Sequence, residues 1–354
     1  MQELRYGVIG AGLMGLEHIG NFNALDGTTV SAVADPHGPS QAAATELAAN
    51  PVELFDDYRA MLDADVCDAV IVATPNMTHI DVLRDVLASD LPVLVEKPMC
   101  TTIEDCQEVV ELTNARDAMV WVGLEYRYMP PVAKLIDELP NAGRVHMVAI
   151  REHRFPFLTK VDDWNRFSRN TGGTFVEKCC HFFDLMGLLA GGSPVTVMAS
   201  GGQSVNHLEE YYDGERSDIL DNGFVIVEYD NGARGMLDLC MFAEATHNQE
   251  EISVVGEAAK LEALIPEDVI RVGYRGKHWI GDVEITPVAD PSIGFQGTHH
   301  GSSFVQNRLF DEAIRTGGAP AVTVEDGLLS VAVGKAAHRS IDEGRPVEMS
   351  EILP

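Results

Sequence analysis

The chain has 354 residues, more than one hydrophobic core usually spans, so we expect two domains. Its 25 basic and 55 acidic side chains give a net charge of −30, which argues against nucleic-acid or anionic-membrane partners because these require a basic face. Such acidity is typical of a well-solvated surface, with adaptation to high salt as the alternative.

The N-terminal residues show no feature of a secretory leader. Met-Gln-Glu-Leu-Arg-Tyr lacks a basic stretch followed by a long apolar run, and it leads directly into an expected strand. No apolar run elsewhere approaches the ~20 residues that span a bilayer. The six cysteines contain no C-x-x-C pair, which favours reduced thiols. We therefore expect a cytoplasmic protein.

Short apolar segments alternate with segments of helical spacing in the first third of the chain. The expected strands are 6–9, 29–34, 69–73, 92–95 and 120–123, and the expected helices are 13–25, 78–88 and 102–116. Strands separated by helices indicate a parallel sheet with right-handed crossovers. We therefore predict an α/β fold whose first domain, residues 1–124, is a doubly wound parallel sheet.

After about residue 125 the pattern changes to longer strands. Those expected are 144–153, 194–201, 223–230, 233–241, 251–256 and 259–264, followed by helices at 302–316 and 325–343. Turn residues at 230–232 and 256–257 indicate hairpins. We predict that residues 125–354 form an α+β domain with a large, mainly antiparallel open sheet, whose last helix packs back towards the first domain. Because an open sheet needs its exposed face covered, we expect a homodimer or homotetramer.

A glycine-rich motif follows the first expected strand. Gly10-Ala11-Gly12-Leu13-Met14-Gly15 fits G-x-G-x-x-G, in which the glycines allow a tight turn, a close approach of the backbone to pyrophosphate and helix-on-strand packing. The free amides at the helix start can bind the phosphates. Asp35 ends the second strand, where it can accept hydrogen bonds from both ribose hydroxyls. This context favours a Rossmann dinucleotide site over an unrelated glycine-rich turn.

The same aspartate favours NAD over NADP. A carboxylate repels a 2′-phosphate, and the residues after Asp35, Pro36 to Pro39, include no Arg or Lys. A protonated His37 is the one group there that argues for NADP.

Further candidate cofactor contacts follow two other strands of the first domain. They are Thr74, Pro75 and Asn76, then His79, Glu96 and Lys97. A turn with Thr78 as helix N-cap is the structural alternative for the first group, and helix capping is the more typical role for His79.

Two blocks carry the candidate chemistry. Glu96-Lys97-Pro98 leaves Lys97 at the carboxyl end of a strand, where open α/β sheets bind ligands. Glu177, His181 and Asp184 are spaced i, i+4, i+7, so on one continuous helix they project from one face. Two carboxylates beside an imidazole can hold a ligand with several hydroxyls while His181 takes a proton. The alternative is a buried helix whose polar residues pair internally. Nothing else completes a zinc site, so we predict no metal.

Weaker candidates for substrate contact lie in irregular segments. Tyr126 and Arg127 follow the last strand of the first domain, and Trp164 lies in a segment, 153–170, that is rich in aromatic and basic residues. His300 precedes an expected helix. Coverage of a domain boundary, capping or packing is the alternative for these residues.

Together these motifs resemble the Gfo/Idh/MocA oxidoreductase family over nearly the whole chain. The resemblance is carried by the glycine fingerprint, Thr-Pro-Asn at 74–76, Glu-Lys-Pro at 96–98, residues 123–128 and the Gly-Gly…His-x-x-Asp block at 172–184. It implies that Lys97 and His181 face the substrate beside the nicotinamide and that Glu177 binds substrate hydroxyls. The family usually has Asp where this chain has Glu177, followed by an apolar residue and Gly where this chain has Lys178 and Cys179.

The resemblance implies an NAD-dependent dehydrogenase that oxidises a secondary hydroxyl of a cyclic polyol, sugar or glycoside, such as an inositol or a pyranose. His181 suits the role of base because an imidazole is matched to neutral pH, and Lys97 can stabilise the developing alkoxide. Two alternatives stay open. One is an NAD-dependent glycosidase that acts by transient oxidation and elimination, and the other is a non-catalytic NAD sensor.

Overall fold

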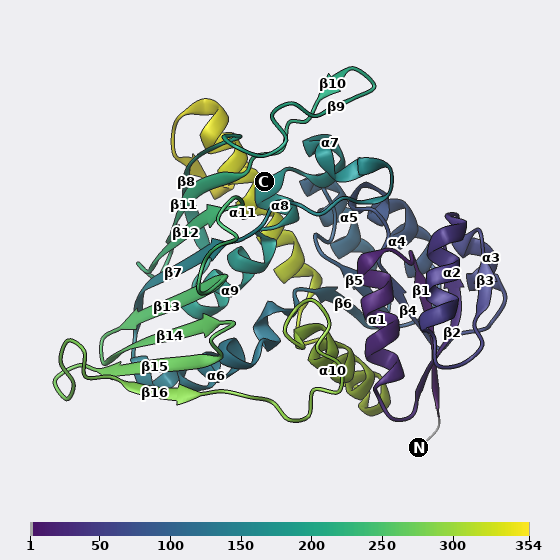
Figure 1. Cartoon of the computed structure of the whole chain (residues 1–354), viewed down its shortest axis with the longest axis horizontal. Helices are drawn as coiled ribbons and strands as arrows, with labels where there is room; N and C mark the ends of the chain where they lie inside the picture. The colour runs from purple at the N-terminus through teal and green to yellow at the C-terminus, as the bar shows by residue number, and fades with distance from the viewer. Residues whose placement is uncertain (1–2, 354) are drawn as a thin grey trace. The chain divides into compact units, whose positions relative to one another are not determined.

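The computed structural model describes residues 3–353, and these form two compact units (Figure 1). The first unit comprises Met1–Tyr128, Lys160–Asp162 and Pro291–Val331, and the second comprises Met129–Thr159, Asp163–Asp290 and Ala332–Pro354. Met1 and Gln2, which begin the segment searched for a leader, and Pro354 lie outside the described residues. No helix within residues 3–353 is both long and apolar enough to cross a membrane.

The first unit is built on a six-stranded parallel sheet. Its strands are β1 (Leu4–Ile9), β2 (Thr28–Ala34), β3 (Glu53–Phe55), β4 (Ala69–Val72), β5 (Val93–Glu96) and β6 (Val120–Gly123). They lie in the order β3-β2-β1-β4-β5-β6, and every neighbouring pair is parallel. The strand order reverses between β1 and β4, which is where doubly wound sheets bind their ligands.

Helices alternate with these strands, and one more comes from much later in the chain. They are α1 (Leu13–Asn23), α2 (Gly38–Leu47), α3 (Tyr58–Asp63), α4 (His79–Leu87), α5 (Ile103–Asn114) and α10 (Ser302–Thr316). α10 packs on α1, and its Phe310 ring lies 6.4 Å from the ring of Tyr6 and 6.1 Å from that of Trp121. All three rings are buried, so a distant segment completes this core.

The second unit is built on a nine-stranded sheet with the order β16-β15-β14-β13-β7-β12-β11-β8-β17. The strands are β7 (Val145–His153), β8 (Pro194–Gly202), β11 (Asn222–Tyr229), β12 (Arg234–Cys240), β13 (Glu250–Gly256), β14 (Ala259–Ile265), β15 (Val269–Tyr274), β16 (Glu284–Pro287) and β17 (Val347–Glu348). β7 and β12 pair in parallel, and the other neighbours are antiparallel. A separate small sheet joins β9 (Tyr211–Tyr212) and β10 (Glu215–Arg216).

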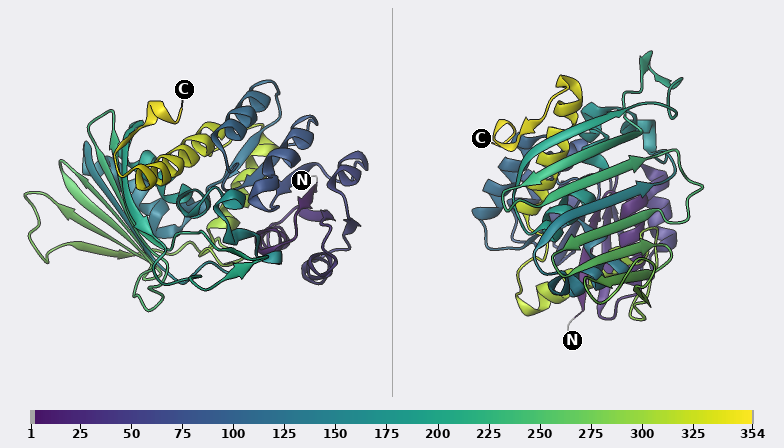
Figure 2. Two further views of the ribbon diagram at one scale, coloured as in Figure 1. Left: turned by 90° about the horizontal axis from the view of Figure 1, so that it is seen from above. Right: turned by 90° about the vertical axis from the view of Figure 1, so that its left-hand side faces the viewer.

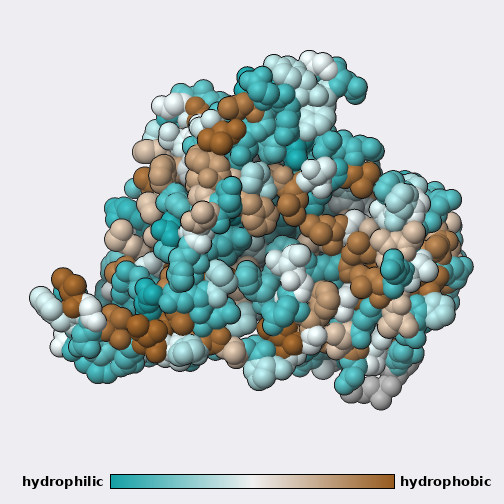
Figure 3. Space-filling view, in the orientation of Figure 1, coloured by the Kyte–Doolittle hydropathy of each residue, from teal (hydrophilic) through white to brown (hydrophobic). Residues whose placement is uncertain are grey.

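Helices of the second unit pack on one face of the large sheet. α6 (Pro130–Glu138) contacts β14 and β15, and α9 (Cys180–Ala190) contacts β7 and β12. Figure 2 shows the sheet face-on from its other side, where Met198, Ile226 and Met236 are exposed register neighbours on β8, β11 and β12. Figure 3 shows further hydrophobic atoms at the β15–β16 hairpin, where Trp279 and Ile280 of the connecting loop and Ile285 of β16 are exposed.

The predicted α/β class is confirmed, as are the doubly wound parallel sheet and the large, mainly antiparallel sheet. Several features were not predicted, among them α2, α3, α6, β3, β15, β16 and the parallel pairing of β7 with β12. The final helix, α11 (Val324–Glu343), contributes residues to both units because the division falls between Val331 and Ala332. The separate roles of residues 1–124 and 125–354 stay a prediction.

Candidate functional site

The glycine motif forms the turn between β1 and α1. Gly10 has a φ of +91°, and a Cβ there would lie 2.6 Å from the carbonyl oxygen of Ala73, so only glycine fits. A Cβ at Gly15 would lie 2.0 Å from the carbonyl oxygen of Gly10. By contrast, a Cβ at Gly12 would meet no described atom within 4 Å. The turn therefore leaves room at the N-terminus of α1, beside the amides of Leu13 and Met14, where a pyrophosphate group fits.

Asp35 is held beside this turn by two backbone amides. Its Oδ2 accepts a hydrogen bond from Ala11 N (2.7 Å), and its Oδ1 accepts one from His37 N (2.8 Å). These bonds orient the carboxylate and leave its remaining lone pairs for ribose hydroxyls. The His37 ring is engaged by its own helix, because Nδ1 lies 2.8 Å from Ser40 Oγ. The residues present therefore fit the adenosine end of NAD.

The loop after β4 is tied to the loop after β5. His79 is fully buried, with Nε2 3.0 Å from the Thr74 carbonyl oxygen and Nδ1 2.9 Å from the Pro98 carbonyl oxygen. Burial lowers the pKa of His79, and a neutral imidazole donates to one of these carbonyls at a time. Thr78 occupies the N-cap position of α4, but its side chain makes no capping hydrogen bond, and its Oγ1 donates to the Pro75 carbonyl oxygen (2.7 Å). The predicted position of Thr78 at the start of α4 is confirmed, without the capping bond, and His79 bridges two loops that carry Asn76 and Lys97.

Lys97 follows the last residue of β5, and a buried ion pair fixes its backbone. Glu96 Oε1 lies 2.9 Å from His18 Nε2, and Glu96 Oε2 accepts a hydrogen bond from Lys97 N (3.2 Å). His18 Nδ1 lies 3.0 Å from Asn307 Oδ1 on α10. Burial opposes both charges, but the mutual hydrogen bond raises the pKa of His18 and lowers that of Glu96. These shifts favour an imidazolium beside a carboxylate, and the pair anchors Glu96, the residue directly before Lys97.

A second buried carboxyl group, which the sequence did not single out, lies close to Glu96. Glu125 begins a 3-10 helix, Glu125–Tyr128, two residues after Gly123, the register partner of Glu96. Its side chain is fully buried, and burial, together with the charge of Glu96, raises the pKa of Glu125 to about 7. The first unit therefore holds a carboxyl group that titrates near neutral pH.

The other candidates of the first unit have structural contacts within it. The Tyr126 ring is buried with its centroid 6.2 Å from the ring of His299, the residue before His300. Arg127 pairs with Asp326 (Nη2 to Oδ2, 3.2 Å) and donates to the Ala321 carbonyl oxygen. His300 has a φ of +54° and is half-buried.

In the second unit, Glu177, His181 and Asp184 lie on two helical segments instead of one. Glu177 ends the short helix α8 (Thr174–Glu177), and α9 begins at Cys180, so the prediction of one continuous helix is wrong. Lys178 and Cys179 form a turn, with a ψ of −4° at Cys179, and the amides of both Phe182 and Phe183 bond to the Cys179 carbonyl oxygen (2.9 Å each). The three predicted side chains are each less than 10 % exposed, at 6 %, 1 % and 8 %.

The turn before α8 is held by α11. Gly173 has a φ of +93°, and a Cβ there would lie 2.3 Å from His338 Nε2. Phe175 N donates to this nitrogen (3.1 Å), and burial lowers the pKa of His338 to about 4, so the ring is a neutral acceptor at neutral pH. Lys335 Nζ donates to the Gly172 carbonyl oxygen (3.1 Å). These contacts set the start of the segment that leads to Glu177.

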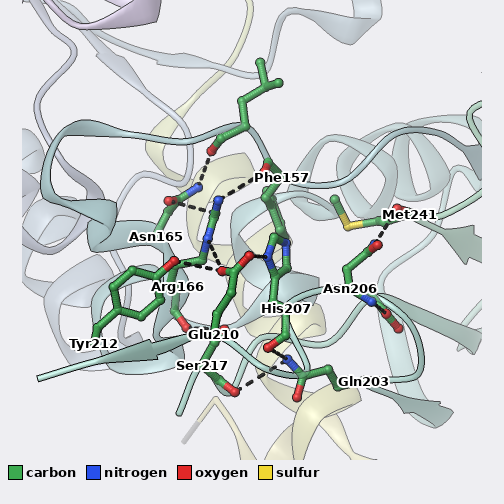
Figure 4. A network of polar contacts seen from close by, with 12 residues as sticks. Phe157, Asn165, Arg166, Gln203, Asn206, His207, Glu210, Tyr212, Ser217 and Met241 are labelled. Atoms are coloured by element: carbon green, nitrogen blue, oxygen red, sulfur yellow. Dashed lines mark hydrogen bonds and ion pairs between the residues drawn. The ribbon is translucent and has the colours of Figure 1, made fainter. Parts of the chain in front are cut away.

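The irregular segment that contains Trp164 is anchored by a buried arginine (Figure 4). Arg166 donates to Glu210 Oε2 (3.1 Å) and to Asn165 Oδ1 (3.1 Å), and Glu210 Oε2 also accepts from the Tyr212 hydroxyl (2.8 Å). Trp164 is half-buried, and its carbonyl accepts from Asn170 Nδ2 (2.9 Å). The segment is therefore an ordered loop joined to the β9–β10 hairpin.

Two family models match the chain. Residues 4–124 match the model described as oxidoreductase family, NAD-binding Rossmann fold, and residues 139–349 match oxidoreductase family, C-terminal alpha/beta domain. The chain belongs to the Gfo/Idh/MocA oxidoreductase family. The family model agrees with the glycine turn and Asp35, so the chain is an oxidoreductase with NAD as its cofactor.

Relatives of the Gfo/Idh/MocA family match this member from end to end. Myo-inositol 2-dehydrogenase of Thermotoga maritima is 26 % identical and covers 99 % of this chain and 100 % of its own. Inositol 2-dehydrogenase 2 of Saccharopolyspora erythraea is 29 % identical, with coverages of 98 % and 96 %. The solved structure of levoglucosan dehydrogenase with NADH and levoglucosan superimposes with a TM-score of 0.84 at 18 % identity, covering 98 % of this chain and 100 % of that chain. The last comparison shows a shared fold.

The family motifs are divided between the two units. The first unit holds the candidates Gly10 to Gly15, Asp35, Thr74 to Asn76, His79, Glu96, Lys97, Tyr126, Arg127 and His300, and the second holds Trp164, Glu177, His181 and Asp184. Several residues near these candidates were missed, namely His18, Glu125, Asn307 and His338. Glu125 lies inside a quoted family motif and could have been noticed. The other residues act across long sequence separations, and no local pattern marks them.

Proposed function

We propose that this family member is an NAD-dependent dehydrogenase that oxidises a secondary hydroxyl of a cyclic polyol, sugar or glycoside. The observation that carries the proposal is the α8–α9 segment, which buries two carboxylates and an imidazole between Glu177 and Asp184. A carboxylate can accept hydrogen bonds from two neighbouring hydroxyls of a ring, and an imidazole can take a proton near neutral pH. The inositol 2-dehydrogenases that match over the full length support the same substrate class.

The chain's own groups have separate roles in this proposal. His181 removes the hydroxyl proton at a ring nitrogen, and Lys97 donates a hydrogen bond from Nζ to the same oxygen as negative charge develops on it. Bound NAD supplies the hydride acceptor. The Glu96–His18 pair holds Lys97, and Glu177 and Asp184 bind other hydroxyls of the ring. That Lys97 and His181 serve one substrate rests on the family motifs.

A screen for NADH formation tests the proposal. Purified protein with NAD is offered myo-inositol, scyllo-inositol, glucose, levoglucosan and a simple secondary alcohol, and absorbance of NADH is followed. We expect turnover of at least one polyhydroxylated ring and little of the simple alcohol. NAD binding by calorimetry without turnover of any ring would instead favour a sensor. Release of nitrophenol from nitrophenyl glycosides without net NADH would favour the glycosidase.

Glu177→Gln tests whether Glu177 binds hydroxyl groups of the substrate. The amide keeps the size of the side chain but replaces one acceptor oxygen with a donor. A site built to pair hydroxyls discriminates strongly when a partner is lost, so KM for the ring substrate should rise while the poor turnover of a simple alcohol changes little. Equal loss for both alcohols, with the circular dichroism spectrum unchanged, would mean that Glu177 supports His181 and does not read hydroxyls.

We also propose that the protein is a homodimer or homotetramer. The exposed apolar side chains of Met198, Ile226 and Met236 on one face of the large sheet support this proposal, because such patches mark interaction surfaces. Light scattering after size exclusion checks the mass, and Ile226→Lys should lower it. A wild-type mass equal to one chain would contradict the proposal.

A further inference from the structure

Glu152 and Glu250 lie on the buried face of the large sheet, in a row next to two rows of apolar residues. β7 and β13 are antiparallel neighbours, and successive buried rows pair Val148 with Val254, Ile150 with Ile252 and Glu152 with Glu250. Each of these six side chains is 1 % exposed or less. The third row therefore places two carboxyl groups directly opposite each other in an otherwise apolar layer.

Two cations meet one of these carboxylates. Lys178 Nζ lies 3.0 Å from Glu152 Oε1, and Arg154 Nη1 lies 3.2 Å from the same oxygen. The Lys178 side chain is only 6 % exposed, and it comes from the turn between α8 and α9. The ion pair therefore joins that turn directly to a central strand of the sheet.

Stability alone does not account for this arrangement. The free-energy cost of removing two charges from water often exceeds the gain from their attraction. Proteins with well-packed apolar side chains in place of such a pair are commonly as stable or more stable. The two preceding rows show that apolar pairs fit at this face. The opposite glutamate adds to the cost, because burial and the charge of Glu152 raise the pKa of Glu250 to about 7. The ion pair instead fixes the position of the α8–α9 turn relative to β7, because its geometry is directional.

We propose that Lys178 is a positioning residue whose ion pair with Glu152 fixes the α8–α9 turn and thereby the orientation of Glu177 relative to His181. The inference rests on the proposed function, in which Glu177 and His181 serve the substrate. The two helical segments are separated only by Lys178 and Cys179. Without the tie to β7, this turn can rearrange, and a shift of about 1 Å at a reacting group can lower the rate by ~10²-fold.

A thiol-labelling experiment tests the tie without reference to activity. Cys179 and Cys180 lie in and directly after the turn and are fully buried, so an alkylating reagent reaches them only when the segment opens. The full-length protein and its Lys178→Met variant, each with NAD, are treated with N-ethylmaleimide, and the peptides are quantified by mass spectrometry. We expect Cys179 and Cys180 to label at least about 10-fold faster in the variant. The buried Cys67 and Cys106 of the first unit should keep their wild-type rates.

A matched control lies on the same two strands. Arg151 pairs with Glu251, its register partner on β13, next to Glu152 in sequence but on the other face, where both side chains are about one-third exposed at 35 % and 34 %. Arg151→Gln should leave the labelling of Cys179 and Cys180 unchanged. Lys178→Arg keeps the charge and should restore most of the protection. Because Lys178→Met leaves Glu152 less compensated, the double variant with Glu152→Gln provides a second variant without that charge.

The labelling and the kinetics separate the two proposals. On a ring substrate, Lys178→Met should lower kcat about 10-fold or more while NAD affinity stays within about twofold. If Cys179 and Cys180 label at the wild-type rate in both Lys178→Met and the double variant, the positioning role is overturned whatever the kinetics show. Equal acceleration at Cys67 would also overturn it, because the opening would then be global. Faster labelling confined to the turn, in a protein that oxidises no polyol, would support the tie and refute the proposed function.

Discussion

Each unit places a buried ion pair next to a candidate catalytic side chain, but the charges are arranged in opposite ways. In the first unit the acidic member, Glu96, directly precedes Lys97, and its partner His18 comes from α1. In the second unit the basic member, Lys178, lies three residues before His181, and its partner Glu152 comes from β7. Each pair therefore ties a site segment to a more regular element of its own unit.

The difference lies in the presence of a histidine. Burial opposes the charge of His18, but the hydrogen bond to Glu96 raises its pKa above the ordinary imidazole value, so the pair beside Lys97 weakens as pH rises through that raised pKa. The pair of the second unit joins a lysine to a glutamate and contains no histidine. The comparison teaches that two anchors of similar geometry can differ in their response to pH through one choice of residue.

The largest expected effect comes from removing the candidate base of the second unit. His181→Ala should lower kcat/KM for a ring substrate by about 10²–10⁴-fold, because no group remains to take the hydroxyl proton. Activity should recover partly as pH rises and hydroxide substitutes. Initial rates across a pH series measure both effects. A variant whose pH profile matches that of the wild type would move the proton-transfer role to another residue, first of all Lys97.

The corresponding change in the first unit is Lys97→Met. It should lower kcat by about 10²-fold, because an electrostatic stabiliser of the developing alkoxide is lost, and it should leave NAD binding nearly intact. Steady-state kinetics and calorimetric titration with NAD measure the two quantities. Loss of NAD affinity with kcat retained would place Lys97 in the cofactor site.

Breaking the first ion pair should cost stability in a way that depends on pH. Glu96→Gln leaves His18 without a carboxylate. Removing one member of a buried ion pair can lower the free energy of unfolding by up to about 3–5 kcal/mol. The pKa of His18 is raised in the folded state, so the wild-type pair stabilises fully below about pH 6.5 and loses this contribution as pH rises through the folded pKa. Urea unfolding at pH 6 and pH 9 should show the larger loss at pH 6. An equal loss at both values would mean that His18 is uncharged in the fold.

A smaller effect, this time a gain in stability, is expected when Glu250 of the second unit or Glu125 of the first unit is replaced by glutamine. The pKa values of Glu250 and Glu125 are both raised to about 7 by burial and by a neighbouring glutamate. A raised carboxyl pKa means that wild-type stability falls as pH rises from the unfolded pKa of about 4.5 through 7. Glu250→Gln should therefore stabilise the protein by about 1–3 kcal/mol at pH 8 and hardly at all at pH 5. Thermal unfolding at both pH values checks this, with Glu125→Gln as the counterpart in the first unit; destabilisation that is greater at pH 8 would contradict it.

The smallest effect is expected for the exposed pair on the far face of the same strands. Arg151→Gln should change the free energy of unfolding by no more than about 0.5 kcal/mol, since exposed ion pairs contribute little. Raising the salt concentration should reduce even this difference. A cost comparable to that of Glu96→Gln would show that burial is not what separates these pairs.

The sequence predicted the elements that are fixed by local patterns. The strand before Gly10 and the strand before Lys97 are short apolar runs bounded by turn residues, and both were placed within about two residues. The hairpin at Asp230-Asn231-Gly232 followed from its turn chemistry. α2 was missed because only Ser40 and Ala44 of its ten residues are buried, so it carries no apolar stripe.

The site was predicted as far as its motifs extend. Lys97 and His181 were singled out because their blocks resemble a family, whereas His18 lies 78 residues from its partner Glu96 and no spacing rule links them. The continuous helix expected through Glu177 and His181 failed at Lys178. The spacing of the apolar residues around Lys178 is helical. The Lys178 side chain, however, pairs with Glu152 on β7, which is too distant in sequence for a local pattern to reveal.

The contact between Gly173 and His338 has a consequence for mutational libraries. The imidazole occupies the space that a side chain at position 173 would need, with Nε2 2.3 Å from the position of a Cβ. The backbone at Gly173 also has a φ of +93°, which residues with a side chain rarely adopt. Randomising position 173 should therefore return almost only glycine, even in a library that also varies position 338.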